Sequence, residues 1–512
     1  MSCFRWCPCL PFGSDSNGKD TTAHRKSKPH LVYLNEQKVL QDVYDLGKLL
    51  GEGGFGKVWI ATRTKDSGEQ VAVKGVSCQH FGHAEYARVL DSPEVKAMQR
   101  LDHPNVCRIM ETFSDESYLY LVMEFCCGGD LCDKMTDLVN AGSRLPVHDA
   151  ASYMRQIFSA VAHMHVLDVG HFDLKLENVL LSGKDDRALC KVVDFGLAQQ
   201  IKRGERKTSM IGSKYYIAPE ILNESYDIRA DNWSCGVIMY IFLTNEPPFN
   251  EQQTEIIYYR IREQSISFPT DAGENATNLL KSLLQRDVHA RMTARRALRH
   301  AWFEEELGTD TTPKLPREIL DGLESLTSGL GFKRLMWRAI IERTEDEDAQ
   351  VQKFQEDFRI LDSEGQGFLK VDDLMSGLEH LDNNPMELKS VLEEHVKRIN
   401  DDGQLQYSDF IAALMVGLNH TPTEKALRSA FHFFDRSGMD AISVSDIERV
   451  LRFDDKKHET SAIIALIDQV DTDRDGKMSY NEFLAFLGIK TGWQKVFDSV
   501  KATFLGRSSS DA

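Results

Sequence analysis

The sequence predicts an α+β domain followed by an all-α domain, and three observations support this fold class. Between residues 44 and 77, apolar runs surround a cluster of glycines, which is typical of short strands joined by tight turns. From about residue 150 to residue 303, apolar residues recur at helical spacing, as in Ala150–Leu167. From about residue 350, a helix, a short Asp- and Gly-rich loop and a second helix repeat four times.

The charge of the chain limits the classes of function that it can have. A length of 512 residues allows about two to four domains with sizeable cores. The formal net charge of −18 argues against a protein that binds nucleic acid. Residues 345–490 contain 31 acidic and 16 basic residues, so −15 of the −18 lies there. This acidic region is either a solvated surface or a group of cation sites.

The cysteines and apolar runs indicate an intracellular chain without a membrane span. Ten cysteines in a chain of this length do not indicate a disulfide scaffold, and their spacing resembles no zinc site. The longest apolar run, Cys235–Leu243, is far too short to cross a bilayer. We therefore expect a cytoplasmic protein.

Residues 1–43 are predicted to be a mostly disordered extension, because they show no sustained periodicity. They lack the apolar core of a secretory signal, and Ser2 stands where N-myristoylation needs glycine. Cys3, Cys7 and Cys9 are candidates for palmitate, which would bring the chain to a membrane. A tail that merely contains cysteines has equal weight.

A glycine-rich turn lies between the first two predicted strands. Residues 51–58 follow the spacing G-x-G-x-x-G-x-V, and glycines let the backbone approach phosphate oxygens closely. The next strand carries Lys74, whose ammonium could reach the α- and β-phosphates of a nucleotide. Glu94 opens a helix and could orient Lys74; alone, it reads more readily as a solvated helix charge. The glycine-rich turn supplies these predicted nucleotide-binding residues: Gly51, Gly53, Gly54, Gly56 and Val58.

Two further motifs follow in order. The stretch from Gly170 to Leu181, GHFDLKLENVLL, contains Asp173, Lys175 and Asn178, and Asp194 lies in VVDFGLA. Together with the glycine-rich turn, these motifs resemble the protein kinase family over residues 44–303. The resemblance implies the bilobal α+β protein kinase fold and transfer of the γ-phosphate of ATP.

The resemblance assigns roles to these residues. Asp173 matches the catalytic aspartate that accepts the substrate hydroxyl proton, and Lys175 matches the lysine that supports the transferring phosphate. Lys74 and Glu94 complete the catalytic set. Asn178 and Asp194 match the ligands of two magnesium ions. The nucleotide cofactor is therefore ATP with Mg2+.

The adenine-binding hinge and the structural pairs also match the family. The hinge is Glu124–Cys126 after a Met123 gatekeeper, with Glu124 and Cys126 as cofactor-binding residues. Asp130 matches a ribose or substrate contact. Glu220 is expected to pair with Arg291, and Asp231 to hold the catalytic loop. The lysine of DLKLEN, together with Ser213 in GSKYYIAPE, favours a serine/threonine kinase over a tyrosine kinase.

One departure concerns activation. The family usually has His-Arg-Asp where this chain has His171, Phe172 and Asp173, and that arginine pairs with an activation-loop phosphate. The loop of residues 199–212 contains four basic residues and one acidic residue, so it offers no acidic substitute. We expect packing to order this loop and control to lie elsewhere. The alternative is that Phe172 packs locally and another arginine makes the pairing.

The fourth repeat fits a calcium loop at every ligand position. Residues 471–482 place side-chain oxygens at positions 1, 3 and 5, a backbone carbonyl at position 7 and a glutamate at position 12. Gly476 allows the sharp turn at position 6. The predicted calcium ligands are Asp471, Asp473, Asp475, Lys477 and Glu482.

The other three loops depart from this pattern. The loop of residues 362–373 ends in Asp373, which is shorter than glutamate, so we expect weak calcium or magnesium binding. The second loop begins with Arg398, a cation in a ligand position. In the third, Met439 and Asp440 replace a ligand and the turn glycine. We expect the last two to be structural hands that pair with a partner.

The order of these parts resembles the calcium-dependent protein kinases of plants and apicomplexan-type protists. The predicted parts are a kinase domain (44–303), an amphipathic junction (304–349), a calmodulin-like EF-hand domain (350–490) and a C-terminal tail (491–512). The resemblance implies that the junction blocks the kinase at rest. Calcium then makes the hands bind the junction.

We therefore predict a calcium-regulated, non-specific serine/threonine protein kinase with ATP, Mg2+ and Ca2+ as cofactors. Its partners are protein substrates with Ser or Thr near basic residues and its own junction; we expect a monomer that binds no nucleic acid. One alternative is a calcium-sensing pseudokinase scaffold, and another is a calcium buffer. A chain truncated after Phe303 is expected to be active without calcium.

Overall fold

The computed structural model describes most of the chain, and its contacts divide the chain into two compact units. The first unit comprises Met1–Pro313 and Ala349–Gly377, and the second comprises Lys314–Asp348 and Leu378–Ala512. The described residues are 33–34, 39–53, 56–64, 68–77, 93–115, 118–185, 188–328, 331–344, 348–378, 385–435, 437–451 and 460–489.

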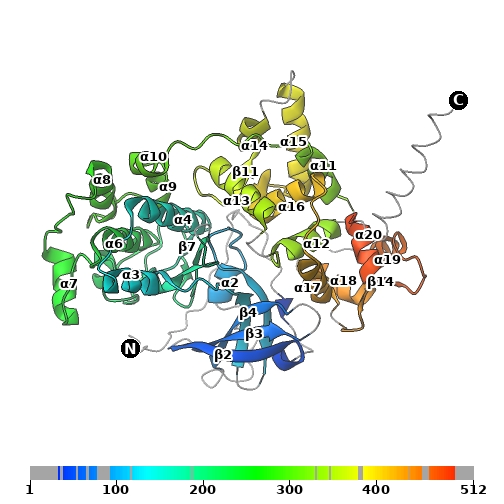
Figure 1. Ribbon diagram of the computed structural model, residues 1–512, viewed down its shortest axis with the longest axis horizontal. Coiled ribbons are helices and arrows are strands. Elements are labelled where there is room, and N and C mark those ends of the chain that lie inside the picture. The colour runs from blue at the N-terminus through cyan, green and yellow to red at the C-terminus, as the bar shows by residue number, and fades with distance from the viewer. Residues whose placement is uncertain are drawn as a thin grey trace. The chain divides into compact units, whose positions relative to one another are not determined.

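The first unit begins with a six-stranded sheet in the order β1-β5-β6-β4-β3-β2. Figure 1 labels its strands β2, β3 and β4. All its neighbouring pairs are antiparallel except β1 and β5. The last residue pair of the β2–β3 hairpin is Gly53 and Gly56, so the glycine-rich turn lies at one end of the sheet. The strands are β1 (Tyr33–Leu34), β2 (Tyr44–Gly53), β3 (Gly56–Arg63), β4 (Gln70–Ser77), β5 (Ile109–Ser114) and β6 (Tyr118–Glu124).

The end of the predicted N-terminal extension is ordered, which corrects the expectation for residues 1–43. Strand β1 pairs in parallel with β5, with Tyr33 opposite Glu111. The short 3-10 helix η1 (Leu40–Asp42) follows, and Leu40 is buried in the apolar core of the sheet. These residues are ordered because the sheet edge supplies backbone partners and its core covers Leu40. Cys3, Cys7 and Cys9 lie outside the described residues.

Helices dominate the rest of the first unit. The apolar face of α4 packs against α6, α9 and α10 in a core that includes Phe158, Trp233 and Trp302. Helix α10 continues to Leu307, four residues past the predicted end of the domain. The helices are α2 (Pro93–Met98), α3 (Leu131–Asn140), α4 (Val147–Val166), η4 (Leu176–Asn178), α5 (Pro219–Leu222), α6 (Ala230–Thr244), α7 (Thr254–Glu263), α8 (Glu274–Leu283), α9 (Ala294–Ala297) and α10 (Ala301–Leu307).

Short strands in this half frame the loops that carry the predicted catalytic residues. Strand β7 (Val169–Gly170) pairs with β10 (Gln199–Gln200), and β8 (Val179–Leu181) pairs with β9 (Cys190–Val192). Asp173 therefore lies between β7 and β8, and Asp194 follows β9 directly.

The first of the four hands groups with the first unit. It consists of α13 (Ala349–Leu361), β11 (Phe368–Lys370) and α14 (Val371–Leu378). The contacts assign Ala349–Gly377 to the same unit as residues 1–313. This grouping differs from the predicted single domain over residues 350–490.

The second unit contains two junction helices and three hands. The junction helices are α11 (Ile319–Leu326) and α12 (Phe332–Ile341). Strands β13 and β14 pair in antiparallel register, so the third and fourth hands form a pair, as expected. The hands comprise α15 (Pro385–Ile399), β12 (Gln404–Gln406), α16 (Tyr407–Gly417), α17 (Glu424–Phe434), β13 (Ala441–Ser443), α18 (Val444–Leu451), α19 (Thr460–Asp468), β14 (Lys477–Ser479) and α20 (Tyr480–Leu487).

The junction is buried among the hands of this unit. Helix α11 packs so closely on α16 that a Cβ on Gly322 would lie 1.9 Å from the Ala413 carbonyl oxygen. The same holds for Gly417 of α16, whose Cβ would lie 1.9 Å from the Glu318 carbonyl oxygen. Helix α12 contacts α16, α17 and α20. The Phe332 ring lies 5.4 Å from the ring of Phe434, so the apolar face of the junction is covered by hand helices.

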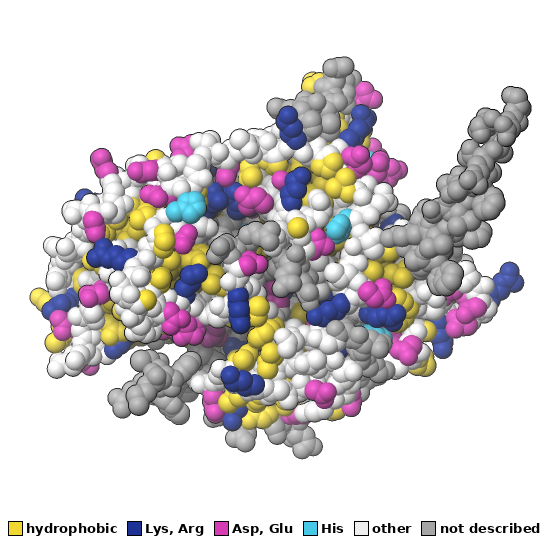
Figure 2. Space-filling model, viewed as in Figure 1, with side chains coloured by type: hydrophobic (Ala, Val, Ile, Leu, Met, Phe, Trp, Pro, Cys, Tyr) yellow, Lys and Arg dark blue, Asp and Glu magenta, His cyan; other side chains and the backbone are white. Residues whose placement is uncertain are grey.

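The surface fits the composition of the sequence. Figure 2 shows Lys and Arg side chains interspersed with Asp and Glu side chains over the face drawn. Within the described ranges, none of the helices is both long enough and apolar enough to span a bilayer.

Candidate active site and calcium loops

One buried carboxylate holds the catalytic loop. Asp231, at the start of α6, accepts hydrogen bonds from the backbone nitrogens of His171 at 2.9 Å and Phe172 at 2.8 Å. Asp231 Oδ2 also lies 3.0 Å from Nε2 of the His165 ring. Phe172 has a left-handed backbone with φ 62°, a conformation that side chains adopt at a cost. The Asp231 contacts therefore fix this turn and the direction of Asp173.

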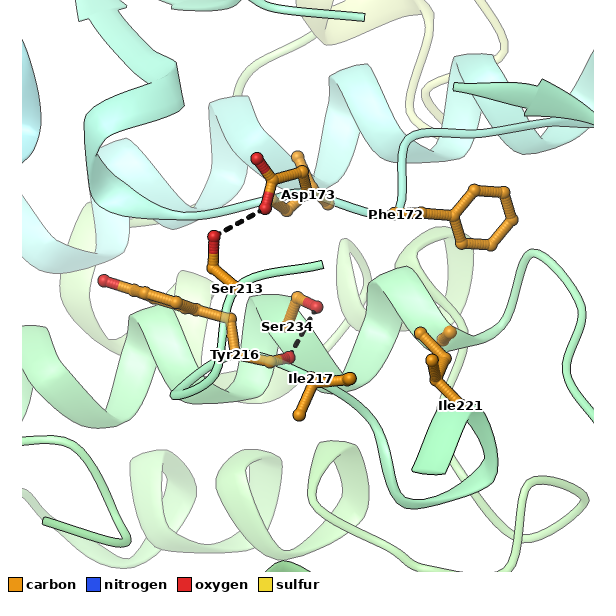
Figure 3. A pocket seen from close by; sticks show the side chains of 9 residues that line it. Phe172, Asp173, Ser213, Tyr216, Ile217, Ile221 and Ser234 are labelled. Carbon is orange, nitrogen blue, oxygen red and sulfur yellow. Dashed lines mark hydrogen bonds between the residues drawn. The ribbon is translucent and has the colours of Figure 1, made fainter. Parts of the chain in front are cut away.

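The Asp173 carboxylate is surrounded by donors. Its Oδ1 accepts a hydrogen bond from the Ser213 hydroxyl at 2.7 Å, as Figure 3 shows, and its Oδ2 accepts one from Lys175 Nζ at 2.8 Å. Asn178 Nδ2 donates to the Asp173 carbonyl oxygen at 2.8 Å. Burial lowers the pKa of Lys175, but the charge of Asp173 raises it overall, so this lysine stays charged. A hydroxyl, a carboxylate and an ammonium thus meet at one point.

Lys74 and Asp194 form the second charged pair. Lys74 Nζ lies 2.9 Å from Asp194 Oδ1, and the Lys74 side chain is buried. Burial would raise the pKa of Asp194, but Lys74, His171 and Lys175 lower it overall. Asp194 is therefore an anionic oxygen donor beside Asn178, whose side chain is also buried. Carboxylate and amide oxygens of this kind fit magnesium.

The pairing of β3 with β4 places Lys74 on the strand next to the glycine-rich turn. Val58 of β3 lies opposite Lys74 of β4, which places the lysine on the strand next to the turn. Gly56 has φ 126°, and a Cβ there would lie 2.1 Å from the Gly75 carbonyl oxygen, so only glycine fits. Gly51 and Gly53 lie in β2. Gly54 falls outside the described residues.

The predicted hinge is anchored by ion pairs. The Glu124 carboxylate lies 2.9 Å from Arg108 Nη2 and 3.1 Å from Lys191 Nζ. These contacts fix the position of the Glu124 side chain. Cys126 is buried. Asp130 caps the N-terminus of α3 by accepting a hydrogen bond from the Asp133 nitrogen at 2.8 Å.

The structure leaves one predicted catalytic contact open. Glu94 lies in the first turn of α2, but its side chain falls outside the described residues. In the structure, Lys74 pairs with Asp194. The pairing of Lys74 with Glu94 therefore stays a prediction. By contrast, the expected structural pair is present, because Arg291 Nη2 lies 2.9 Å from Glu220 Oε2.

Phe172 fills an apolar pocket. It is buried, and its ring makes an edge contact with Tyr226 at 5.3 Å. A Cβ on Gly170 would lie 2.3 Å from the Phe172 ring, so the glycine makes room for it. Figure 3 shows the Phe172 ring directed away from the Asp173 carboxylate. A ring in this position offers an activation-loop phosphate no charge.

The activation segment is held by backbone and side-chain contacts to the segment around Tyr226. Lys207 and Tyr226 exchange two backbone hydrogen bonds, at 2.9 and 3.1 Å. The Ser209 and Tyr226 hydroxyls lie 3.2 Å apart, and Arg206 lies 3.3 Å from Asp227. Because Tyr226 also packs on Phe172, the two aromatic rings link this segment to the catalytic loop. Sequence reasoning missed Tyr226, since no motif marks it.

Replacing Thr208 and Ser209 with alanine should therefore leave calcium-stimulated phosphate transfer within about threefold of the wild-type rate. The change removes one exposed hydroxyl contact, which contributes little, and keeps both backbone hydrogen bonds of Lys207. Steady-state transfer to a peptide measures the effect. Phe172→Ala is the informative comparison, because it removes the aromatic contact with Tyr226. An obligatory phosphate at either hydroxyl would overturn this account.

The fourth loop brings its predicted ligands together. One oxygen from each of Asp471, Asp473 and Asp475 lies within 4.8 Å of the others. Gly476 has φ 77° and accepts the left-handed turn without a Cβ clash. The Gly476 nitrogen donates to Asp471 Oδ2 at 2.9 Å, which fixes the first ligand.

Glu482 closes the same loop. Its carboxylate accepts hydrogen bonds from the backbone nitrogens of Thr472 at 2.7 Å and Ser479 at 2.9 Å. Burial would raise the pKa of Glu482, but the Ser479 and Thr472 hydrogen bonds lower it to about 2. The loop thus presents a permanent carboxylate at position 12. These residues fit a hard cation with oxygen ligands.

The second and third loops depart from the ligand pattern of the fourth loop. In the second, the Asp409 carboxylate at position 12 lies 3.8 Å from Arg334 of the junction. In the third, Met439 stands at ligand position 5, and Asp440 has φ 54° where glycine fits best. His432 lies close to both aspartates. The structural role of these two hands stays a prediction.

Comparisons with known proteins place these features in a family. Residues 44–303 match the model of the protein kinase domain, and residues 424–488 match an EF-hand domain pair. The fold and the site thus define a protein kinase with calcium-binding hands. The chain is 32% identical over 473 residues to calcium-dependent protein kinase 32 of Arabidopsis thaliana, which covers 91% of this chain and 86% of the relative.

A relative from a protist matches to the same extent. Calcium-dependent protein kinase 3 of Plasmodium berghei is 32% identical over 466 residues, or 88% of this chain and 81% of the relative. Calcium-dependent protein kinase 20 of Oryza sativa subsp. japonica is 31% identical over 482 residues, or 92% and 86%. The chain belongs to the calcium-dependent protein kinase family.

Proposed function

We propose that this chain is a calcium-regulated serine/threonine kinase that transfers the γ-phosphate of ATP to hydroxyls of proteins. One observation carries the proposal. The Ser213 hydroxyl lies 2.7 Å from Asp173 Oδ1 and 3.2 Å from Lys175 Nζ. This is the arrangement that an acceptor hydroxyl needs, with a carboxylate to take its proton and an ammonium to support the phosphate.

In this reaction Asp173 orients the acceptor hydroxyl and takes its proton. Lys175 stays charged and stabilises negative charge on the transferring group. Lys74 binds the phosphates of ATP from β4, and Glu94 orients it. Asn178 and Asp194 would hold magnesium, which neutralises phosphate charge when bound.

Acidic groups near the catalytic loop support a preference for basic residues around the acceptor. Asp130, Asp133 and Glu177 all act on the Cys132 thiol; burial first, and then these charges, raise its pKa to about 11. A cluster of negative charge beside η4 attracts Lys or Arg of a substrate. The preference for serine and threonine hydroxyls over tyrosine rests on Lys175 and Ser213, whose motifs favour a serine/threonine kinase.

Regulation passes through the junction and the fourth hand. Glu482 lies in the first turn of α20, and Phe486 of the same helix lies 6.2 Å from the junction ring of Phe332. A calcium ion held by Glu482 therefore acts on a helix that contacts the junction directly. Calcium stabilises the state in which the hands cover the junction, and the covered junction leaves the kinase free.

The remaining proposals concern the location and the oligomeric state of the protein. The chain acts as a cytoplasmic monomer, and acylation of Cys3, Cys7 and Cys9 brings it to membranes. Labelling with an alkyne palmitate analogue tests this part, with a Cys3→Ser, Cys7→Ser, Cys9→Ser variant as the control.

One assay tests the proposed function. The purified chain is given ATP, magnesium and peptides that carry Ser, Thr or Tyr near arginines, with calcium or with a chelator. We expect transfer to Ser and Thr peptides only, and much faster transfer with calcium. A pseudokinase scaffold would transfer phosphate in neither condition. Equal transfer with calcium and with chelator would show that calcium does not regulate the kinase.

Truncation should release the kinase from calcium. A chain that ends after Pro313 keeps all of α10 and Asp310, whereas the truncation after Phe303 considered from the sequence would cut this helix. Without the junction, we expect phosphate transfer in the presence of a chelator. A chain that ends after Asp348 keeps the junction without the hands and is the matched control. Similar activity of the two folded chains in chelator would contradict inhibition by the junction.

A further inference from the structure

The first hand makes an ion-pair contact with the helical half of the kinase. Glu364, at position 3 of the loop Asp362–Asp373, is bound by two arginines. Arg299 Nη2 lies 2.5 Å from Glu364 Oε1, and Arg295 of α9 pairs with Glu364 Oε2. Each of the two carboxylate oxygens is thus paired with a guanidinium.

The backbone of the same loop lies directly on α4. The Gln366 carbonyl oxygen lies 2.6 Å from Nδ1 of the buried His163 ring. A Cβ on Gly367 would lie 2.1 Å from that nitrogen, and a Cβ on Gly365 would lie 2.7 Å from Leu298 Cδ1. By contrast, Gly476 at position 6 of the fourth loop has no such atom within 4 Å. The glycines of the first loop therefore serve close packing.

A second ion cluster joins the same hand to the kinase. Asp310, just after α10, lies 3.2 Å from Arg155 of α4 and 3.0 Å from Arg359 of α13. Arg359 also pairs with Glu356 at 2.5 Å. Single pairs at partly exposed positions contribute little, but this cluster and the Glu364 pairs flank one packed interface. Their combined effect is to fix the hand on α4 and α9.

These contacts compete with a cation for the same oxygens. A calcium loop directs the oxygens at positions 1, 3, 5 and 12 to one ion. Here both carboxylate oxygens of Glu364 are engaged by Arg295 and Arg299. An ion in this loop would have to displace two guanidinium groups and disturb the packed backbone.

We propose that the first loop is a docking element bound to the helical half of the kinase domain, and not a cation site. Arg295 and Arg299 supply the positive charge that calcium supplies in the fourth loop. The first hand thus stays attached to the kinase whether or not calcium is present, and only the later hands respond to it. This revises the weak calcium or magnesium site expected from the sequence. It deepens the proposed regulation but does not depend on phosphate transfer.

Hydrogen exchange of the full chain tests the docking. In the wild type, the amides of residues 362–370 should exchange equally slowly with calcium and with chelator. Arg295→Glu combined with Arg299→Glu should speed their exchange by at least about tenfold. Adding Glu364→Arg to this pair restores opposite charges and should restore slow exchange. Slow exchange of these amides in the wild type only with calcium would overturn the docking. Slow exchange that persists in the Arg295→Glu, Arg299→Glu variant would overturn it as well.

Calcium binding gives an independent test with a matched pair of variants. Glu364→Gln and Asp473→Asn change position 3 of the first and fourth loops. Calorimetry with calcium alone, and then with magnesium alone, should show the wild-type number of ions for Glu364→Gln. Asp473→Asn should weaken calcium binding and leave the exchange of residues 362–370 unchanged. Loss of an ion in Glu364→Gln would overturn the proposal. Neither readout needs ATP, so a failure here is distinct from a failure of the proposed function.

Discussion

Replacing Asp173 with asparagine should lower phosphate transfer by about 10²–10⁴-fold, the usual effect of losing a general base. Asparagine keeps the size of the side chain and can still accept the Ser213 hydroxyl. It cannot take a proton, and it removes the charge that Lys175 faces at 2.8 Å. Steady-state transfer to a peptide, measured with saturating calcium, gives the decrease.

Two controls separate this effect from damage to the fold. Calcium binding to the Asp173→Asn chain should equal that of the wild type, because Asp173 and the fourth loop belong to different compact units. Ser213→Ala removes the hydroxyl that occupies the acceptor position and should affect transfer far less than loss of the base. Turnover near the wild-type rate in Asp173→Asn would exclude Asp173 as the base.

Replacing Glu482 with glutamine should abolish activation by calcium. Glutamine lacks the charge and the two equivalent oxygens that position 12 contributes to the ion. The loss acts on α20, whose Phe486 lies 6.2 Å from the junction ring of Phe332. We expect the rate measured with calcium to fall to the rate measured with chelator, and calorimetry to show that tight binding is lost.

The matched control is Asp446→Asn, which changes position 12 of the third loop. The third loop has Met439 at ligand position 5 and Asp440 in place of the turn glycine, so calcium activation should persist. Three or four tight ions in the wild type would contradict a dominant fourth loop. So would normal activation of the Glu482→Gln chain.

The acidity of Glu482 adds a dependence on pH. Its pKa of about 2 in the folded chain lies below the ordinary value for glutamate. The stabilisation that its hydrogen bonds provide is therefore complete above the unfolded value of about 4.3 and is lost as the pH falls towards 2. The Glu482 carboxylate stays ionised throughout neutral assay conditions.

Local patterns in the sequence were sufficient to locate most of the candidate site. The glycine-rich turn, Asp173, Asp194 and the loop of residues 471–482 each depend on residue types at fixed short spacing. Phosphate and calcium impose such spacing, because a turn and its ligands come from one short stretch of backbone. The same holds for the helix–loop–helix repeats, whose period is visible in the sequence.

The tertiary structure decided which distant residues meet. Phe172 pointed to an unusual activation mechanism, but only the fold brings Tyr226 to its ring, 54 positions away in the sequence. The oxygens of the first loop predict a weak cation site, whereas the fold brings Arg295 and Arg299, which precede Glu364 by 69 and 65 positions, to the Glu364 carboxylate. Side-chain chemistry specifies what a loop can bind, whereas packing between elements far apart in sequence determines which partner occupies it.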